Sequence, residues 1–312
     1  MDKVLITDIS TSVLQDGLIN LGYKVINMPD IDQNYVEAHI HEYEGIIVRS
    51  KITLFESTLR KAKKLKFIGR PGSGLDLIDL KFCATNNIKV CRSATSNSNA
   101  VAEHALGMLL AWMNNLVRSD NEVKKKIWRR EDNRGIELMG KTVGIIGFGN
   151  TGSRFAQKLS GMSVNILAYD KYKEGYLDDF PHVKASSIKE ICQEADILSL
   201  HLPLNTETKH YLNYELLTAF VKPILVINTS RGPIVDTKIL LEGLRSGRII
   251  GACLDVLENE NPSEYTDKEQ NIYNELFGLD QVLLSPHVAG WSDKSKIQME
   301  SFLLDEIADK TA

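Results

Sequence analysis

Short apolar runs recur at a regular interval through the first 95 residues of the chain. They read KVLIT, KVIN, GIIV, KFIG and IKV, and they begin near residues 3, 24, 45, 66 and 88, with polar, helix-compatible segments between them. Strands that alternate with helices at such a spacing, here about 21 residues, are typical of parallel βαβ units. The pattern therefore predicts a small doubly wound α/β domain in this part of the chain.

The pattern changes at residue 98. Residues 99–112 contain no helix breaker except Gly107 and are apolar on several faces, so residues 98–128 are predicted to form one long helix buried between domains. A second series of strands is predicted at residues 142–147, 164–169, 196–200, 224–228, 250–254 and 282–285, and a final helix from residue 292. The length of 312 residues is enough for two such domains.

Composition and charge exclude several classes of protein. The formal net charge is −4, which gives no general basis for binding nucleic acid or a membrane surface. The longest apolar runs are too short to cross a bilayer, and the first residues show no signal-peptide pattern, so we expect a cytoplasmic protein. The four cysteines are scattered without a CxxC pair, so we expect neither a disulfide framework nor a metal site.

A glycine motif opens the second series of strands. Gly147-Phe-Gly-Asn-Thr-Gly152 has the spacing G-x-G-x-x-G and lies between a predicted strand at 143–146 and a predicted helix at 151–159. In this context Gly147 permits a tight turn, Gly149 lets the backbone approach a pyrophosphate, and Gly152 lets the helix pack on the strand. The free N–H groups at the start of the helix attract phosphate. The motif predicts a dinucleotide site, whereas three ordinary turn glycines are the simpler alternative.

An acidic residue ends the next predicted strand. Asp170 follows Gly152 by 18 residues and can accept hydrogen bonds from ribose hydroxyls while repelling a 2′-phosphate. This favours NAD over NADP as the cofactor, although Lys171 and Lys173 lie close to it in the sequence.

Three later strands end in polar residues that a hydrophobic core would not accept. Arg231 follows the strand at 224–228, Glu260 follows the strand at 250–254, and His287 ends the last strand. Because ligands of parallel sheets bind beyond the carboxyl ends of the strands, these side chains are expected to share one rim. Histidine can donate and accept the proton of an alcohol, a carboxylate can fix its tautomer, and arginine can clamp a substrate carboxylate. Taken singly, each is equally explained as a turn residue or a surface ion pair.

With these motifs the sequence resembles the D-isomer-specific 2-hydroxyacid dehydrogenase family over nearly its whole length. The resemblance is carried by GRPGSGLDLID at residues 69–79, NSNAVAEH at 97–104, HLPLNTET at 201–208, NTSRG at 228–232 and SPHVAG at 285–290. It implies a Rossmann cofactor domain, residues 98–288, inserted into a flavodoxin-like substrate domain formed by residues 1–97 and 289–312. It also implies NAD-dependent hydride transfer on a small 2-hydroxy or 2-keto acid.

The resemblance implies a role for individual residues. Arg231, Glu260 and His287 are implied to be catalytic, and counting five residues on from Asp255 favours Glu260 over Glu258 as the partner of His287. The implied cofactor site comprises Gly147, Phe148, Gly149, Asn150, Thr151, Gly152, Asp170, His201, Pro203, Thr229, Ser230, Asp255, His287 and Gly290. The expected substrate site comprises Arg49, Arg70, Ser73, Gly74, Asn97 and Arg130.

Within the family, residues 128–172 most resemble the D-3-phosphoglycerate dehydrogenases, in a short form that ends at Ala312 without a regulatory domain. This implies 3-phosphoglycerate and 3-phosphohydroxypyruvate of serine biosynthesis as substrates. Arg49 and Arg70 end predicted strands and are expected to bind the phosphate, unless each pairs with an acid such as Glu44 or Asp76. The apolar helix from Asn99 predicts a homodimer. Alternatives are a reductase of glyoxylate, hydroxypyruvate or D-lactate type, and an NAD-sensing protein similar to the family's corepressors.

Overall fold

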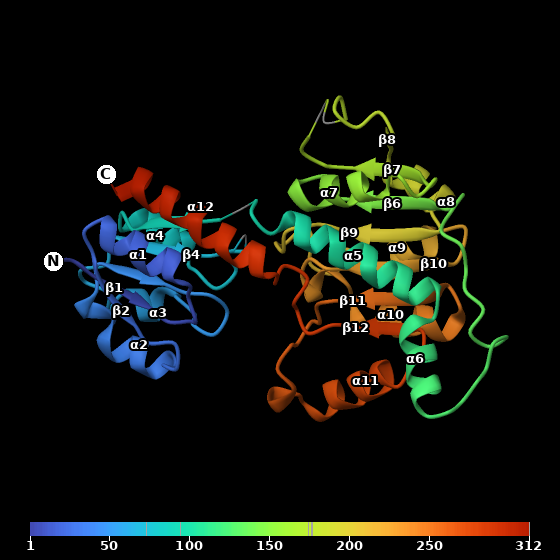
Figure 1. Ribbon diagram of the computed structural model, residues 1–312, viewed down its shortest axis with the longest axis horizontal. Coiled ribbons are helices and arrows are strands. Elements are labelled where there is room, and N and C mark those ends of the chain that lie inside the picture. Colours follow the sequence, from blue (N-terminus) through green and yellow to red (C-terminus); the bar gives the residue numbers. More distant parts are fainter. Residues whose placement is uncertain (73, 94, 174, 176, 312) are drawn as a thin grey trace. The chain divides into compact units, whose positions relative to one another are not determined.

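The protein consists of two compact units (Figure 1). The computed structural model describes residues 1–72, 74–93, 95–173, 175 and 177–311. One unit contains Met1–Asn97 and Trp291–Ala312, and the other contains Ser98–Gly290. The chain therefore returns to the first unit at Trp291, two residues later than residue 289, the boundary expected from the sequence.

The first unit is built on a five-stranded parallel sheet with the order β2-β1-β3-β4-β5. Its strands are β1 (Lys3–Ile6), β2 (Lys24–Asn27), β3 (Gly45–Ile47), β4 (Phe67–Arg70) and β5 (Lys89–Arg92). Its helices are α1 (Ser12–Asn20), α2 (Gln33–His39), α3 (Glu56–Leu59), α4 (Leu80–Thr85) and α12 (Asp293–Thr311). All five strands predicted from the apolar runs are confirmed, and the strand order is that of flavodoxin-like folds.

Both faces of this sheet are covered. Successive side chains of β1 point to opposite faces, so Val4 and Ile6 join one hydrophobic cluster and Leu5 joins the other. The first cluster includes residues of α1 and of α12, the last helix of the chain, which pack side by side (Figure 1). The tail of the chain is thus an integral part of the N-terminal unit.

The second unit is built on a seven-stranded parallel sheet with the order β12-β11-β10-β9-β6-β7-β8. Its strands are β6 (Thr142–Ile146), β7 (Asn165–Tyr169), β8 (Val183–Ala185), β9 (Ile197–Leu200), β10 (Ile224–Asn228), β11 (Ile249–Leu254) and β12 (Val282–Leu284). The six predicted strands are confirmed. The sequence analysis missed β8, a three-residue edge strand in which only Val183 is buried.

Helices cover both faces of this sheet, which makes it a doubly wound fold. They are α5 (Ser98–Met113), α6 (Leu116–Lys124), α7 (Asn150–Leu159), α8 (Ile188–Glu194), α9 (Tyr214–Ala219), α10 (Thr237–Ser246) and α11 (Asp267–Phe277). The prediction of one helix over residues 98–128 is wrong, because Asn115 adopts a left-handed conformation with φ +52° and separates α5 from α6. Asparagine tolerates that conformation better than most residues.

Three further observations concern the whole described chain. None of the described helices is long and apolar enough to cross a membrane. All four cysteines are buried and unpaired with one another. Within the described ranges there is no cluster of three histidine, cysteine or acidic side chains that would hold a metal ion.

Candidate active site

The glycine loop between β6 and α7 has the geometry that a bound dinucleotide requires. Gly147 has φ +91°, and a Cβ on it would overlap the carbonyl oxygen of His201. A Cβ on Gly152 would overlap the carbonyl oxygen of Gly147, so the helix packs directly on the turn. A Cβ on Gly149 would meet nothing within 4 Å. The loop is therefore closed toward the protein at two glycines and open toward solvent at the third, where a phosphate would approach.

Helix α7 begins directly at this open glycine. Its N-cap is Gly149, and within the described residues no side chain caps the first turn. The first N–H groups of the helix are therefore available to an anion. Phe148, Asn150 and Thr151 complete the loop, so the structure brings together the six residues that were predicted to bind the pyrophosphate.

The loops after β9 and β10 lie next to the glycine loop, because β10, β9 and β6 are neighbours in the parallel sheet. They carry His201 with Pro203, and Thr229 with Ser230, all of them predicted cofactor residues. Ser230 donates to Asn228 at 2.7 Å, which orders the loop. The buried hydroxyl oxygen of Thr229 has no hydrogen-bond partner in the described part of the chain. A buried polar atom of this kind fits a site completed by a ligand.

His201 lies between the sheet and α7. Its Nε2 is 2.9 Å from the hydroxyl of Ser199, and its ring packs against Phe155. Burial lowers the pKa of His201 to about 4, so the imidazole is neutral at physiological pH.

Glu260 and His287 form the central pair of the candidate active site. Oε2 of Glu260 lies 2.8 Å from Nδ1 of His287, and both side chains are close to half exposed. Nε2 of His287 has no hydrogen-bond partner among the residues that the structure describes. The carboxylate thus fixes one nitrogen of the ring and leaves the other for a substrate.

Arg231 lies at the same edge of the sheet as this pair. It follows β10, whereas Glu260 follows β11 and His287 follows β12, and these three parallel strands are consecutive neighbours. Its guanidinium donates to the carbonyl oxygen of Ser230 at 2.7 Å.

Glu258 has a different role from Glu260. Its carboxylate lies 2.6 Å from Nε2 of His210 and accepts hydrogen bonds from the amide and the hydroxyl of Thr237 at 2.8 and 2.5 Å. Glu258 therefore ties the loop after β11 to the start of α10 and to the loop after β9. The structure pairs Glu260, not Glu258, with His287.

The loop that carries His287 is fixed by a buried carboxylate. Asp255 is 1% exposed and accepts hydrogen bonds from the amides of Val288 and Ala289, both at 2.9 Å, and from the hydroxyl of Ser285 at 2.5 Å. Its carbonyl oxygen accepts from the amide of His287 at 2.8 Å. These bonds hold His287 in a left-handed conformation with φ +55°. Asp255, which the family resemblance implied to be a cofactor residue, thus already accepts hydrogen bonds from three donors of the protein.

A residue of α5 reaches this network. Nε2 of His104 lies 2.8 Å from the hydroxyl of Ser285 and 3.6 Å from the carboxylate of Asp255. Since Ser285 gives its proton to Asp255, His104 donates to Ser285. The contacts of His104 with Ser285 and of His210 with Glu258 could not be predicted from the sequence, because the partners are distant in the chain.

The predicted substrate residues of the first unit are already engaged. The buried guanidinium of Arg49 lies 3.1 Å from Glu300, a fully buried residue of α12, and 5.5 Å from the centre of the Trp291 ring. Arg70 donates to the carbonyl oxygens of Gly74, at 2.7 Å, and of Arg49. The alternative that each arginine pairs with an acid of the protein therefore holds for Arg49, although its partner is Glu300 and neither of the acids considered.

The other four predicted substrate residues differ in how far they are defined. The carbonyl oxygen of Gly74 accepts from Arg70, Asn97 is half-buried in the turn before α5, and Arg130 is exposed in the segment after α6. Ser73 lies outside the described residues.

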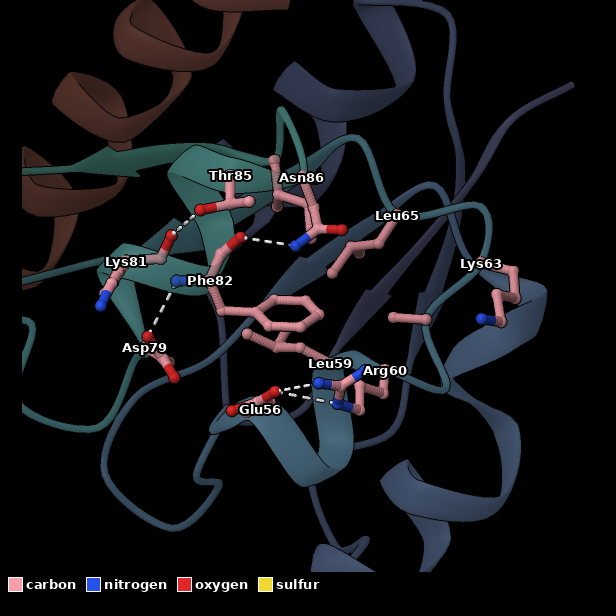
Figure 2. Close-up of a pocket in the computed structure, with 12 residues that line it drawn as sticks. Glu56, Leu59, Arg60, Lys63, Leu65, Asp79, Lys81, Phe82, Thr85 and Asn86 are labelled. Carbon is pink, nitrogen blue, oxygen red and sulfur yellow. Dashed lines mark hydrogen bonds and ion pairs between the residues drawn. The ribbon is translucent and has the colours of Figure 1, made fainter.

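A cavity of about 720 Å³ in the first unit contains none of the predicted site residues (Figure 2). It lies between α3 and α4, over Phe82. Figure 2 shows that its polar groups bind one another: Glu56 pairs with Arg60, Asp79 caps α4, and Thr85 and Asn86 bind backbone carbonyls. This cavity is not the candidate active site.

Comparison with known proteins assigns the family. Residues 106–289 match the family model described as "D-isomer specific 2-hydroxyacid dehydrogenase, NAD binding domain". D-3-phosphoglycerate dehydrogenase of Methanocaldococcus jannaschii is 32% identical over 269 residues, 86% of this chain and 50% of that protein. Hydroxypyruvate reductase of Thermotoga maritima is 32% identical over 290 residues, 93% of this chain and 92% of that protein.

The solved structures give the same result. D-lactate dehydrogenase of Aquifex aeolicus, in complex with NAD and lactic acid, is 28% identical with a TM-score of 0.84, and the match covers 99% of this chain and 96% of that one. The chain spans about half the length of the first phosphoglycerate dehydrogenases it matches. It belongs to the D-isomer specific 2-hydroxyacid dehydrogenase family, and residues 106–289 are its NAD binding domain.

Proposed function

We propose that this protein is an NAD-dependent dehydrogenase of a small 2-hydroxy acid, with Arg231, Glu260 and His287 as its catalytic residues. The observation that carries the proposal is the 2.8 Å contact between Glu260 and Nδ1 of His287, at the sheet edge that also bears the glycine loop. Bound NAD exchanges a hydride with the carbon next to the substrate carboxylate.

Residues of the chain transfer the proton and stabilise the charges that form in the reaction. Nε2 of His287 gives a proton to the ketone oxygen during reduction and takes it back during oxidation. Glu260 holds the ring in one tautomer and balances the charge of the imidazolium. Arg231 binds the substrate carboxylate through parallel hydrogen bonds and polarises the carbonyl group. The test is NADH consumption with a panel of 2-keto acids.

For the acid itself we propose a three-carbon substrate, with 3-phosphohydroxypyruvate as the first candidate. Support comes from the phosphoglycerate dehydrogenases among the relatives and from Arg49 and Arg70 at the ends of their strands. Ser73, Gly74 and Asn97 are proposed to bind the carboxylate, and Arg130 to extend the phosphate site.

Unphosphorylated hydroxypyruvate is the second candidate, and two observations favour it. Glu300 balances the charge of Arg49, and the relative that matches over nearly its whole length is a hydroxypyruvate reductase. The kcat/KM values of the two acids decide between the candidates. A double variant, Arg49→Met with Glu300→Gln, removes the arginine without leaving a buried charge unpaired. It should raise KM for the phosphorylated acid alone if Arg49 binds phosphate, and equal losses on both acids would reject that role.

We further propose that the protein is a homodimer. Apolar side chains of α6 and the segment after it are exposed in the single chain: Leu116, Val117, Val123, Trp128, Ile136 and Met139. A contiguous segment of this kind is typical of a protein interface.

A further inference from the structure

A surface glutamate stands beside the residue expected to bind the adenosine ribose. Glu207 follows β9, and its Oε2 lies 2.7 Å from the ammonium of Lys171 and 2.7 Å from the hydroxyl of Tyr172. Lys171 and Tyr172 come directly after Asp170, which ends β7. The amide of Tyr172 donates to Asp170 at 3.0 Å, so Glu207 is bonded to the same turn that orders Asp170.

Asp170 itself is oriented toward the glycine loop. Its second carboxylate oxygen accepts from the amide of Phe148 at 2.8 Å, which links the end of β7 to the predicted pyrophosphate site. A ribose held by Asp170 would present its 2′ position near the residues that follow Asp170. Lys171 is the first of these, and a lysine at such a place can pair with a 2′-phosphate.

Both lysines of this turn are engaged within the protein. Lys171 pairs with Glu207, and its ammonium also lies 5.4 Å from the centre of the Tyr172 ring. Lys173 donates to the carbonyl oxygen of Phe148 at 3.1 Å. Hydrogen bonds from Lys171 and then from Tyr172 lower the pKa of Glu207, so its carboxylate is charged at physiological pH. Glu207 therefore neutralises the charge of Lys171, the lysine that directly follows Asp170.

We propose that Glu207 is a second residue that selects NAD over NADP, because it neutralises Lys171 and adds a negative charge beside Asp170. The proposal rests on NAD binding and not on the identity of the acid substrate. This role of Glu207 would explain how the turn at residues 170–173, which contains Lys171 and Lys173, can still reject a 2′-phosphate. Removing the charge of Glu207 should leave Lys171 able to pair with that phosphate.

Direct titration tests this without turnover. Dissociation constants of NADH and NADPH are measured by nucleotide fluorescence for the unmodified protein, for Glu207→Gln, and for Glu207→Gln combined with Lys171→Gln. We expect Glu207→Gln to tighten NADPH binding about tenfold, the usual scale for one partly screened charge, and to change NADH binding less than about twofold. The second substitution should abolish the gain. Glu275→Gln, which breaks an exposed pair with Arg245 in the same unit, is the matched control and should leave both constants unchanged.

Three results would overturn the proposal. They are equal affinity of the unmodified protein for NADH and NADPH, an unchanged affinity ratio in Glu207→Gln, and a gain that persists without Lys171. Loss of NADH binding in all variants would contradict the cofactor assignment and this proposal together. Shifted nucleotide affinities in a protein that reduces no 2-keto acid would support the proposal while rejecting the dehydrogenase function.

Discussion

His287 is held by three kinds of constraint at once. Its ring is fixed by Glu260, its amide by the carbonyl oxygen of Asp255, and its left-handed backbone by the bonds of Val288 and Ala289 to the Asp255 carboxylate. A residue other than glycine at φ +55° is disfavoured unless its surroundings hold it there. Strain of this kind is typical of residues whose exact position matters for function.

The first prediction separates the two glutamates of the loop after β11. Glu260→Gln should lower kcat, because His287 loses the carboxylate that fixes its tautomer. Glu258→Gln keeps the pair of His287 and should lower kcat less. Both kcat values are measured with the same 2-hydroxy acid and NAD. A loss of kcat in Glu258→Gln with none in Glu260→Gln would reverse the assignment.

The second prediction concerns stability and the buried histidine of the loop after β9. Burial lowers the pKa of His201 to about 4, from 6.5 for an unperturbed histidine. Between these values the unfolded chain binds a proton that the folded chain does not, so the free energy of unfolding falls as the pH decreases. In this range the free energy of unfolding falls by about 1.4 kcal/mol per pH unit. The decrease is complete below the pKa of His201 in the folded protein.

Chemical denaturation at several pH values measures this effect. His201→Asn removes the titrating group, so its stability should depend less steeply on pH between about 4 and 6.5 than that of the unmodified protein. Equal slopes for the two proteins would show that His201 is not buried in the neutral form.

At the residue scale the sequence predicted that Glu260 lies beside His287, but it did not predict the contacts that support this pair. Glu260 could be chosen over Glu258 by counting from Asp255, because both lie on one short loop. The contacts of His104 with Ser285, of His210 with Glu258 and of Arg49 with Glu300 join residues far apart in the chain. Single-sequence patterns contain no information on such pairs, so Glu300 could not be identified as the partner of Arg49.

Neighbouring loops at the edge of the second sheet pack without space between them. A Cβ on Gly232, in the loop after β10, would overlap the peptide that joins Leu257 and Glu258, in the loop after β11. The hydrogen bonds of Glu258 to Thr237 join the same two loops. The loops that carry Arg231 and Glu260 are therefore packed directly against each other.

The third prediction follows from this close approach. Gly232→Ala must push the two loops apart, because the obstacle is backbone and cannot rotate away. We expect a loss of roughly 3 kcal/mol of stability or more, together with a large drop in kcat/KM. Gly161→Ala, where an added Cβ meets nothing within 4 Å, is the matched control and should be close to neutral. Normal stability and turnover in Gly232→Ala would show that the loops are not in contact.

At the element scale, most strands could be predicted from the sequence, whereas the edge strand β8 and the break between α5 and α6 could not. The predicted strands are short, apolar and regularly spaced, and those at the centre of each parallel sheet are buried. The edge strand β8 lacks that signal, since two of its three residues are exposed. The break at Asn115 depends on one residue taking a left-handed conformation, which propensity alone does not reveal.

The molecule as a whole is two doubly wound units, each with hydrophobic clusters on both faces of its sheet. The return of α12 to the first unit was expected from the family resemblance, not from any local pattern. Among the exposed apolar side chains of the single chain, six lie on α6 and on the segment that follows it.

The fourth prediction is the mass of the protein in solution. We expect a dimer at micromolar concentration, by light scattering after size exclusion. Trp128 is 76% exposed in the single chain, so Trp128→Glu should weaken the dimer without unfolding the unit. A monomeric mass for the unmodified protein would contradict the proposed interface.

Arg231, Glu260 and His287 are proposed to catalyse hydride exchange between NAD and a 2-hydroxy acid. NADH consumption with a panel of 2-keto acids tests this, for the unmodified protein and for His287→Ala and Arg231→Ala. We expect turnover of at least one acid and a loss of kcat/KM of about a hundredfold or more in each variant, the usual scale for a general acid or a charge clamp. NADH binding without turnover of any acid, or near-normal turnover by either variant, would contradict it.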